Sequence, residues 1–504
     1  MKSIEQPVCP GCGYPLHIGE HASNCSTKQE TKIEIPEKQM ETKELIPEFP
    51  GLIIKEQGFL GAGSTEFGKP LFRDLPRETS SQNNEERLID IKETPSMGKA
   101  AFIERTSHID GVDYHFLQWK GIGSNANNEQ MQQKTEQTGE LWAYPLGEKG
   151  VAPLFFLETK GKQLLRFRGA AFYEDLLLEA KQTQRFAAYH LRMPKIVETI
   201  KFDRDFAQTN HLPVPESDDP QDAKGEGLRE FIERYKDQID PVLFEKMLNA
   251  QEFKDGYESA ILGENVRAFR NIWRVDDVEK ILKEPESPER TDKLQLIIES
   301  SKQILSQELG RELTTEEFLL EYATLLGQQA GILIENRLNQ GALLNHKQDI
   351  TLAAEICDFD GAYKLDDEYL SNPEHVPDWV KDEQTRKKWI TQKYLELDRQ
   401  VLLIAAHYKP VIDAASSMEG KIFDIEDVTK KYVEGFIQQL SDEQKKKLKQ
   451  ALLSEEFTRI EAIAGDDQMT KENFSGYQDL FDSIKTLLLK LLSFSTLTKT
   501  NKES

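Results

Sequence analysis

Residues 345–361 read NHKQDITLAAEICDFDG, which is a polar turn, a short apolar run and a closing Asp-Phe-Asp-Gly tetrad. A strand over 350–357 would hold Asp349 at one end and Asp358 at the other, and a hairpin would bring both carboxylates to one side of a sheet. Two carboxylates presented together suit Mg²⁺ that is shared with phosphate oxygens. An acidic hairpin on the surface is the alternative, and the tetrad alone does not separate the two.

The composition limits the class of protein. The chain has 504 residues, enough for about two to four domains. Its 88 acidic and 64 basic residues give a formal charge of -24, which argues against a nucleic-acid backbone as the main partner. No apolar run predicts a transmembrane helix, and the start MKSIEQPVCPGCG lacks the apolar core of a signal peptide. Four cysteines do not make a disulfide framework. We therefore expect an intracellular, cytoplasmic protein without a membrane partner.

Most of the cysteines lie in the N-terminal sequence CPGCGYPLHIGEHASNC, which contains a Cys-x2-Cys turn and a His-x3-Cys pair. Thiolate and imidazole groups at these spacings can close a tetrahedral Zn²⁺ site. The predicted ligands are Cys9, Cys12, His21 and Cys25. His17 is the alternative fourth ligand, and a redox pair is the alternative for the Cys-x2-Cys. A C2HC zinc finger over residues 1–27 would bind a partner, because four protein ligands leave zinc no open position for catalysis.

The rest of the sequence divides into a linker and two larger regions. Residues 28–54 are charged, interrupted by proline and poor in apolar residues, which predicts a flexible linker. Residues 55–265 continue from a glycine-rich start into strand-like segments such as KAAFIERT and VDYHFLQWK, whereas residues 266–504 show amphipathic helical patterns. The glycines could form a phosphate-covering loop or ordinary hairpin turns; they are Gly58, Gly61, Gly63 and Gly68.

The segment VDYHFLQWKGIG ends a predicted strand at Lys120 and continues with Gly121 and Gly123. An ammonium group at that point could face a cleft and neutralise phosphates; a lysine that extends from a strand end into solvent is the alternative. In the later segment GAAFYEDLLLEAKQTQRFA, Glu179 lies beside an apolar stripe with helical spacing. The stripe consists of Phe172, Leu176, Ala180 and Ala187. A helix packed on the sheet could direct Glu179 at Lys120, as in the ion pair that positions the lysine of kinase-like enzymes.

Patterns further along the chain concern both phosphate binding and the helical core. Arg267 and Arg274, in ENVRAFRNIWRVDD (264–277), are candidates for phosphate binding; an amphipathic helix with a solvated basic face is the alternative. The sequence TTEE at 314–317 predicts a capping box for a long apolar helix. Small residues of that helix would permit close packing, namely Gly327, Ala330 and Gly331. A C-terminal apolar stripe should dock on this region, with a membrane-surface role as the alternative; it contains Phe481, Ile484, Leu487, Leu488, Leu491 and Leu492.

Three segments occur in the order QWKGIGSN, YEDLLLEAK and GALLNHKQDITLAAEICDFDGA. They resemble, in turn, the QLKGxG segment, the RExLxSEAM helix and the HGVMNTDNMSILGxTIDYG catalytic segment of the selenoprotein O family, kinase-fold enzymes that transfer AMP to protein hydroxyls. The resemblance implies ATP and Mg²⁺ as cofactors, with Lys120 contacting phosphates and Glu179 orienting that lysine. It also implies that Asp349 and Asp358 hold the metal, since they match the family's metal-binding Asn and Asp. It covers at most residues 55–365.

The catalytic segment departs from the family pattern at several positions. Gln340 stands where the family has the histidine of its HGV element, Gln348 replaces a loop carboxylate, and Tyr173 replaces the arginine of the helix. Asp349 in place of asparagine adds a negative charge at the metal site. His346 could replace the missing base or serve only as a structural loop residue. These departures favour a catalytically inactive pseudokinase, whereas the retained Lys, Glu and Asp favour an enzyme.

The sequence therefore predicts an α+β, bilobal protein-kinase-like fold. The β-rich N-lobe would span residues 55–265 and the helical C-lobe residues 266–504, with the zinc finger in front of both. We expect a transferase, dependent on ATP and Mg²⁺, that moves AMP or phosphate to hydroxyl groups of a protein substrate. The alternatives are a pseudokinase scaffold that recruits a partner through its zinc finger, and a small-molecule kinase.

Overall fold

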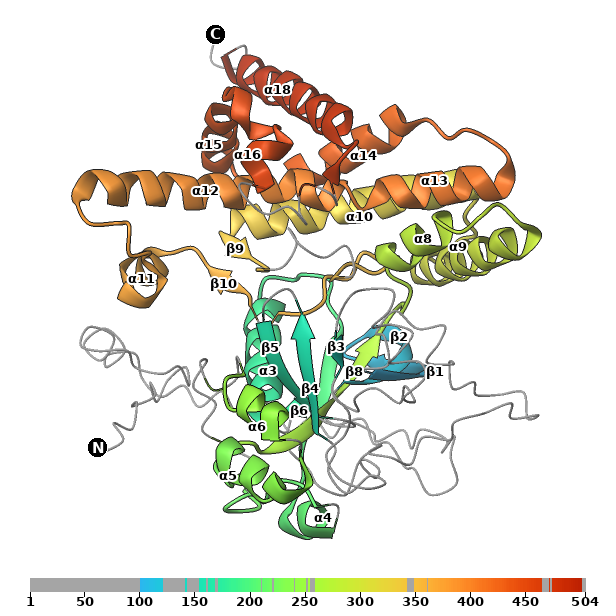
Figure 1. The fold of residues 1–504 in the computed structure, drawn as a ribbon. Helices are drawn as coiled ribbons and strands as arrows, with labels where there is room; N and C mark the ends of the chain where they lie inside the picture. The colour runs from blue at the N-terminus through green and yellow to red at the C-terminus, as the bar shows by residue number, and fades with distance from the viewer. Residues whose placement is uncertain are drawn as a thin grey trace.

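The computed structural model describes residues 100–120, 141–142, 154–159, 162–167, 171–209, 211–219, 222–239, 241–250, 253, 259–341, 349–359, 361–464, 471 and 474–500. The predicted zinc ligands, the linker and the glycines between 58 and 68 lie outside these ranges, and so do Gly121, Gly123, His346 and Gln348. Within the described ranges the protein has an α+β structure with a helical majority and small antiparallel sheets. In Figure 1 the strands that precede residue 270 gather in one half of the molecule and most later helices in the other.

The main sheet has five antiparallel strands. They are β1 (Ala100–Ile109), β2 (Val112–Lys120), β6 (Ala171–Phe172), β7 (Lys195–Lys201) and β8 (Leu262–Phe269). The order is β1-β2-β8-β6, and β7 also pairs with β8. The two predicted strands β1 and β2 meet at a tight turn in which Asp110 and Gly111 have φ of 52° and 81°, as a type I′ turn requires. All residues of the central strand β8 are buried, so the amphipathic-helix alternative is wrong for this part of the chain.

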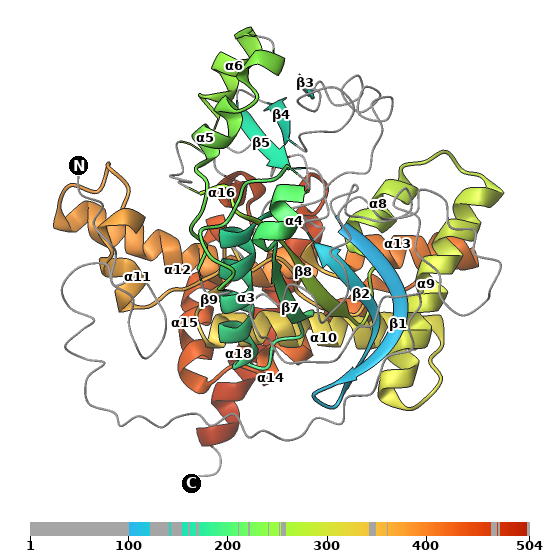
Figure 2. The same ribbon diagram turned by 90° about the horizontal axis from the view of Figure 1, so that it is seen from below.

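Helix α3 (Tyr173–Ala187) packs against β7 and β8 (Figure 2). Leu176 and Ala180 are buried as predicted, but Ala187 is exposed and Phe186 continues the buried stripe in its place. The same packing buries Glu179 to 2% exposure against the sheet. Smaller elements complete this half, namely a sheet of β3 (Leu141–Trp142), β4 (Leu154–Thr159) and β5 (Lys162–Phe167), and the helices α4 (Arg204–Thr209), α5 (Leu228–Glu233) and α6 (Pro241–Met247).

The other half is built from longer helices around one hydrophobic core. Its main helices are α8 (Val275–Leu282), α9 (Pro288–Leu309), α10 (Thr315–Glu335), α12 (Glu383–Ala405), α13 (Tyr408–Glu419), α14 (Ile425–Gln438), α15 (Asp442–Leu452), α16 (Ile460–Ala464) and α18 (Gln478–Thr500). Between α10 and α12 lie β9 (Leu338–Asn339), β10 (Tyr363–Lys364) and α11 (Asp367–Ser371). Thr314 and Glu317 form the predicted capping box of α10, with bonds of 2.8 and 3.2 Å.

The C-terminal stripe packs into this core as predicted. Phe481, Ile484 and Leu488 are fully buried in the same cluster as the apolar residues of α10 and α14. Across the described helices, no stretch combines the length and the apolar character that crossing a membrane requires.

Helices α10 and α14 approach each other closely because both carry glycine at the crossing. A Cβ added to Gly327 would overlap the Tyr432 carbonyl oxygen, and a Cβ on Gly331 would lie 2.6 Å from the Phe436 carbonyl oxygen. From the opposite helix, a Cβ on Gly435 would lie 2.5 Å from the Thr324 carbonyl oxygen. The predicted close packing at Gly327 and Gly331 is therefore confirmed.

Asp398 of α12 lies in the core of this half at 8% exposure. Burial raises the pKa of Asp398 from an ordinary 3.8 to about 7, and the charge of Lys447 opposes this rise only in part. Between about pH 4 and pH 7, Asp398 therefore holds a proton in the folded protein that it releases in the unfolded chain. The stability of the protein falls as the pH rises through this interval.

We predict that Asp398→Asn raises the free energy of unfolding above about pH 7, by an upper limit of about 4 kcal/mol, and has little effect near pH 4. Thermal unfolding over a series of pH values measures this difference. Asp292→Asn, at an exposed position of α9, is the control and should follow the unmodified protein at every pH. A constant offset between Asp398→Asn and the unmodified protein would contradict the prediction.

Candidate functional site

Lys120, the last residue of β2, lies between two carboxylates from distant parts of the chain. Its Nζ is 3.2 Å from Glu179 Oε2 of α3 and 3.1 Å from Asp358 Oδ1. Glu179 is almost fully buried, whereas 30% of the lysine side chain and 27% of the Asp358 side chain remain exposed. The structure thus brings together three of the predicted site residues, and two of them keep part of their side chains exposed.

Two residues of β8 extend this cluster. Arg267 contacts Glu179 through Nη2 at 2.5 Å and Asp358 through Nη1 at 3.2 Å. Asn265 donates from Nδ2 to Glu179 Oε2 at 3.1 Å and is paired with Lys120 in the sheet. Side chains two residues apart on a strand share one face, which is why Asn265 and Arg267 both reach the carboxylate of α3. The sequence pattern indicated Arg267 as a candidate for phosphate binding, but it indicated neither these ion pairs nor a role for Asn265.

The surrounding charges keep Asp358 ionised. Burial by itself would raise the pKa of Asp358, but the charges of Lys120, Arg267 and Arg274 lower it well below its usual range. Burial likewise opposes the charge of Arg267, while Glu179 and Asp358 more than compensate, so the pKa of the guanidinium is raised. Cations and carboxylates therefore neutralise one another in this cluster.

Residues 349–358, called the aspartate hairpin below, differ from the predicted strand. One backbone bridge joins Ile350 to Ile356, and the Cys357 N–H donates to the Asp349 carbonyl at 2.7 Å, so the chain turns tightly between the two aspartates. Asp349 is 1% exposed and the apolar residues of the hairpin are buried, so the surface-hairpin alternative is wrong. Asp358 has φ of 54°, a left-handed conformation that is uncommon for residues with a side chain.

Gln340 connects the two ends of the aspartate hairpin. Its Nε2 donates to the carbonyl oxygens of Cys357 and Asp358, both at 2.7 Å, and lies 3.5 Å from Asp349 Oδ2. The sequence pattern indicated this glutamine only as a departure from the motif that the segment resembles. The Gln340 amide therefore holds the backbone at Cys357 and Asp358 and lies close to the side chain of Asp349.

Arg274 lies just before α8 and is 7% exposed. A backbone bridge pairs it with Thr351 of the aspartate hairpin. Burial acts against its charge, but Cys357, Asp358 and Asp349 act in the opposite direction, so the pKa of Arg274 is raised. Both predicted arginines are therefore buried, and a solvated basic face is wrong for Arg274 as well.

The site combines positively charged side chains with carboxylates. Lys120, Arg267 and Arg274 provide positive charge, and Lys and Arg side chains are the groups that commonly bind phosphate oxygens. No group of three or more Asp, Glu, His or Cys side chains in the described part of the chain could hold a metal by itself. Asp349 and Asp358 are carboxylates of the kind that commonly binds Mg²⁺ together with phosphate and water oxygens.

Comparisons of the chain with protein-family models, with curated proteins and with solved structures find no match.

Proposed function

We propose that this chain is an ATP- and Mg²⁺-dependent transferase of protein-kinase-like, bilobal fold that transfers AMP to hydroxyl groups of proteins. One observation carries the proposal: Lys120 contacts both Glu179 and Asp358, although 59 and 238 residues separate them along the chain. In kinases a strand lysine, a helix glutamate and the aspartate of a DFG motif form this same constellation. Here the strand β2, the helix α3 and the DFDG tetrad provide these groups in the same order.

The side chains divide into two roles in this proposal. Lys120, with Arg267 and Arg274 behind it, would bind the phosphates and stabilise the charge that develops on them. Glu179 holds the ammonium and the Arg267 guanidinium in place. Asp349 and Asp358 would hold Mg²⁺, which when bound neutralises the phosphates and aligns them for in-line attack. A second lobe of helices supplies the aspartate hairpin, so the nucleotide would bind where the two halves meet.

The choice of AMP over phosphate rests on the resemblance to selenoprotein O. AMP transfer requires attack at the α-phosphorus with pyrophosphate as the leaving group, whereas phosphorylation requires attack at the γ-phosphorus. Incubating the purified protein with a heat-treated cell extract, whose own kinases are inactive, and with α-³²P-ATP or γ-³²P-ATP separates the two. We expect protein-bound label from the α-labelled nucleotide alone. Label from the γ-position would show a kinase, and label on metabolites a small-molecule kinase.

Thermal unfolding with nucleotide tests the binding step separately. A ligand that binds only the folded state stabilises it by RT ln(1 + [L]/Kd). ATP with Mg²⁺ should raise Tm, and ATP with EDTA should raise it less. Absence of any shift with ATP, in the presence or absence of Mg²⁺, would contradict the proposed function.

A second candidate is a nucleotide-sensing pseudokinase, and two observations favour it. Lys120 and Arg267 already form ion pairs with Asp358. In addition, Gln348 stands where the selenoprotein O family has a loop carboxylate. A Tm shift with Mg²⁺ and ATP, combined with the absence of label in any product, would support this candidate.

We also propose the N-terminal C2HC zinc finger as the element that recruits a protein partner. Its support is the spacing of Cys9, Cys12, His21 and Cys25. We predict one Zn²⁺ per chain in the purified protein and its loss in Cys9→Ser, because zinc binding would fold a module too small for its own core. Metal analysis by mass spectrometry measures both, and a zinc-free native protein would contradict the assignment.

A further inference from the structure

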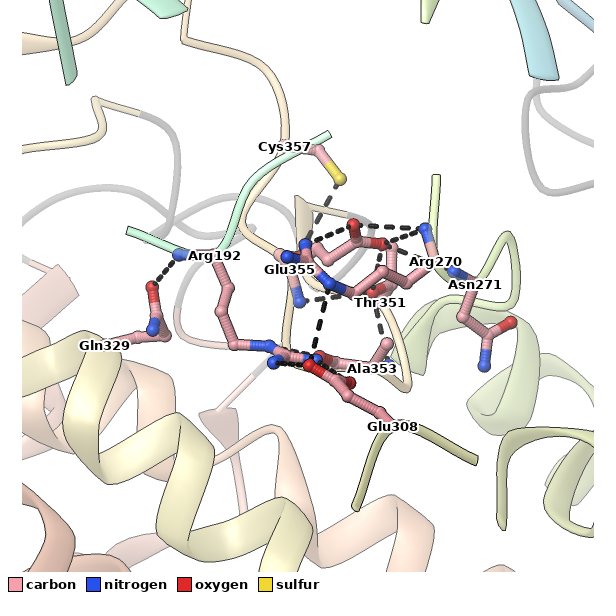
Figure 3. A network of polar contacts seen from close by, with 9 residues as sticks. All are labelled: Arg192, Arg270, Asn271, Glu308, Gln329, Thr351, Ala353, Glu355 and Cys357. Carbon is pink, nitrogen blue, oxygen red and sulfur yellow. Dashed lines mark hydrogen bonds and ion pairs between the residues drawn. The ribbon is translucent and has the colours of Figure 1, made fainter. Parts of the chain in front are cut away.

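Arg192, in the connection between α3 and β7, contacts three other parts of the chain (Figure 3). Its backbone N–H donates to Gln329 Oε1 of α10 at 2.7 Å, and its carbonyl accepts the Ile356 N–H at 2.8 Å. Its Nε donates to the Ala353 carbonyl at 3.0 Å, and its two terminal nitrogens bind the Glu308 carboxylate at 2.5 and 2.7 Å. One residue therefore joins the end of α3 to α9, to α10 and to the aspartate hairpin.

The aspartate hairpin is also held from the end of β8. Glu355 is fully buried and accepts backbone N–H groups of Arg270 at 3.1 Å and of Asn271 at 3.3 Å (Figure 3). The Arg270 guanidinium binds the same carboxylate at 3.1 Å, and its Nε lies 3.8 Å from Glu308. Glu308 thus links the two arginines that hold opposite sides of the hairpin.

These contacts connect the two elements that carry the carboxylates of Lys120. Helix α3 carries Glu179 and ends shortly before Arg192, while the aspartate hairpin ends at Asp358. Ala354, at the tip of the hairpin, has φ of 57°, an uncommon conformation for a residue with a Cβ, and Arg192 binds the carbonyl immediately before it. Because Arg192 is bonded to the hairpin through backbone atoms, the short connection that follows α3 cannot move away from the hairpin without breaking these bonds.

We propose that Arg192 is a positioning residue that couples α3 to the aspartate hairpin and so keeps Glu179 and Asp358 on either side of Lys120. The binding geometry is then a property of the fold itself, and no partner is needed to move α3 into place. The nucleotide readout below rests on the proposed function, whereas the stability readout does not.

The stability readout is a double-variant cycle in thermal unfolding of the full chain. Arg192→Gln and Lys120→Met should each lower Tm, and the combined variant should lose clearly less than the sum, because releasing the hairpin already weakens the contacts of Lys120. Additive losses would overturn the proposal. Arg311→Gln is the matched control, since Arg311 forms exposed ion pairs with Glu317 and Glu321, and its loss should add to that of Lys120→Met.

The nucleotide readout is the ratio of the Kd for ATP without Mg²⁺ to the Kd with Mg²⁺, measured where all variants are folded. Arg192→Gln should reduce this ratio at least about tenfold, and Arg192→Lys should restore it only in part, because lysine cannot make the two-point contact. Arg311→Gln should leave the ratio unchanged. An unchanged ratio in Arg192→Gln would also overturn the proposal.

Two further arrangements keep the test decisive. If Arg192→Gln does not fold, Glu308→Gln weakens the ion pairs of Glu308 with Arg192 and Arg270 and leaves the backbone contacts of Arg192, and the same cycle applies. If the unmodified protein does not bind ATP, the proposed function fails, while the unfolding cycle still decides whether Arg192 couples the two elements.

Discussion

Replacing Asp358 by asparagine should reduce transfer of the α-phosphate label by about 10³-fold, because losing this ligand would remove the stabilisation that Mg²⁺ gives to the reacting phosphates. The same variant should lose the difference between ATP binding with and without Mg²⁺. It should bind metal-free ATP more tightly than the unmodified protein. The Asp358 carboxylate pairs with Lys120 and Arg267, and without its charge the phosphates would no longer compete with it for these two cations. Radiolabel transfer and titration calorimetry measure these three quantities.

The opposite signs of these effects separate a lost metal ligand from general damage. A misfolded variant would lose binding under both conditions, whereas the expected variant loses only the response to Mg²⁺. Asp292→Asn is the reference for an exposed aspartate, because its thermal unfolding should match that of the unmodified protein. If Asp358→Asn binds ATP with the same Mg²⁺ dependence as the unmodified protein, then Asp358 is not a metal ligand.

The substitution Gly327→Ala should cause the largest loss of stability, about 3 kcal/mol or more. The added methyl group would overlap the Tyr432 carbonyl oxygen and lie 3.0 Å from the Phe436 nitrogen. Both are backbone atoms of α14, so a rotamer change cannot relieve the overlap and the two helices must move apart. Chemical denaturation of the variant and of the unmodified protein, fitted with one shared slope of the unfolding free energy against denaturant concentration, measures this loss.

Gly420→Ala is the control for Gly327→Ala. Gly420 caps α13 with φ of 63°, and an added Cβ would meet nothing within 4 Å. Its replacement should cost only about 1 kcal/mol, because the left-handed backbone is the sole source of strain. If Gly327→Ala were no more destabilising than this control, the close approach of α10 and α14 would be incorrect.

Local patterns in the sequence predict some contacts of the site and not others. Lys120 at a strand end and Glu179 beside a helical stripe follow from spacing, which determines the direction of a side chain. The positions of Arg267 and Arg274 do not follow from spacing. Together with Arg270 they have helical spacing, yet Arg267 lies in a central strand. Pairing of β8 with β2 and β7 outweighs the local pattern there, because strand formation depends on neighbours from elsewhere in the chain.

The remaining features depend on contacts between distant segments. The glycines of α10 indicate a close helix crossing, but Gly435 of α14 is recognisable as their counterpart only when the crossing point is known. The bonds of Arg192 to Ala353 and Glu308 connect residues 161 and 116 positions away, and the surrounding sequence HLRMP contains no periodic signal for them. The zinc ligands remain a prediction, since they lie outside the described residues.

Lys120 and Arg267 already balance the charge of Asp358, and this affects the order in which ligands bind. A bare divalent ion would have to displace two fixed cations from this carboxylate, whereas a polyphosphate offers those cations a new partner as it enters. For the proposed transferase this sets a sequence of events in which the nucleotide comes before the metal or together with it. Magnesium alone should then bind weakly, and its occupancy in the cell should follow the supply of nucleotide.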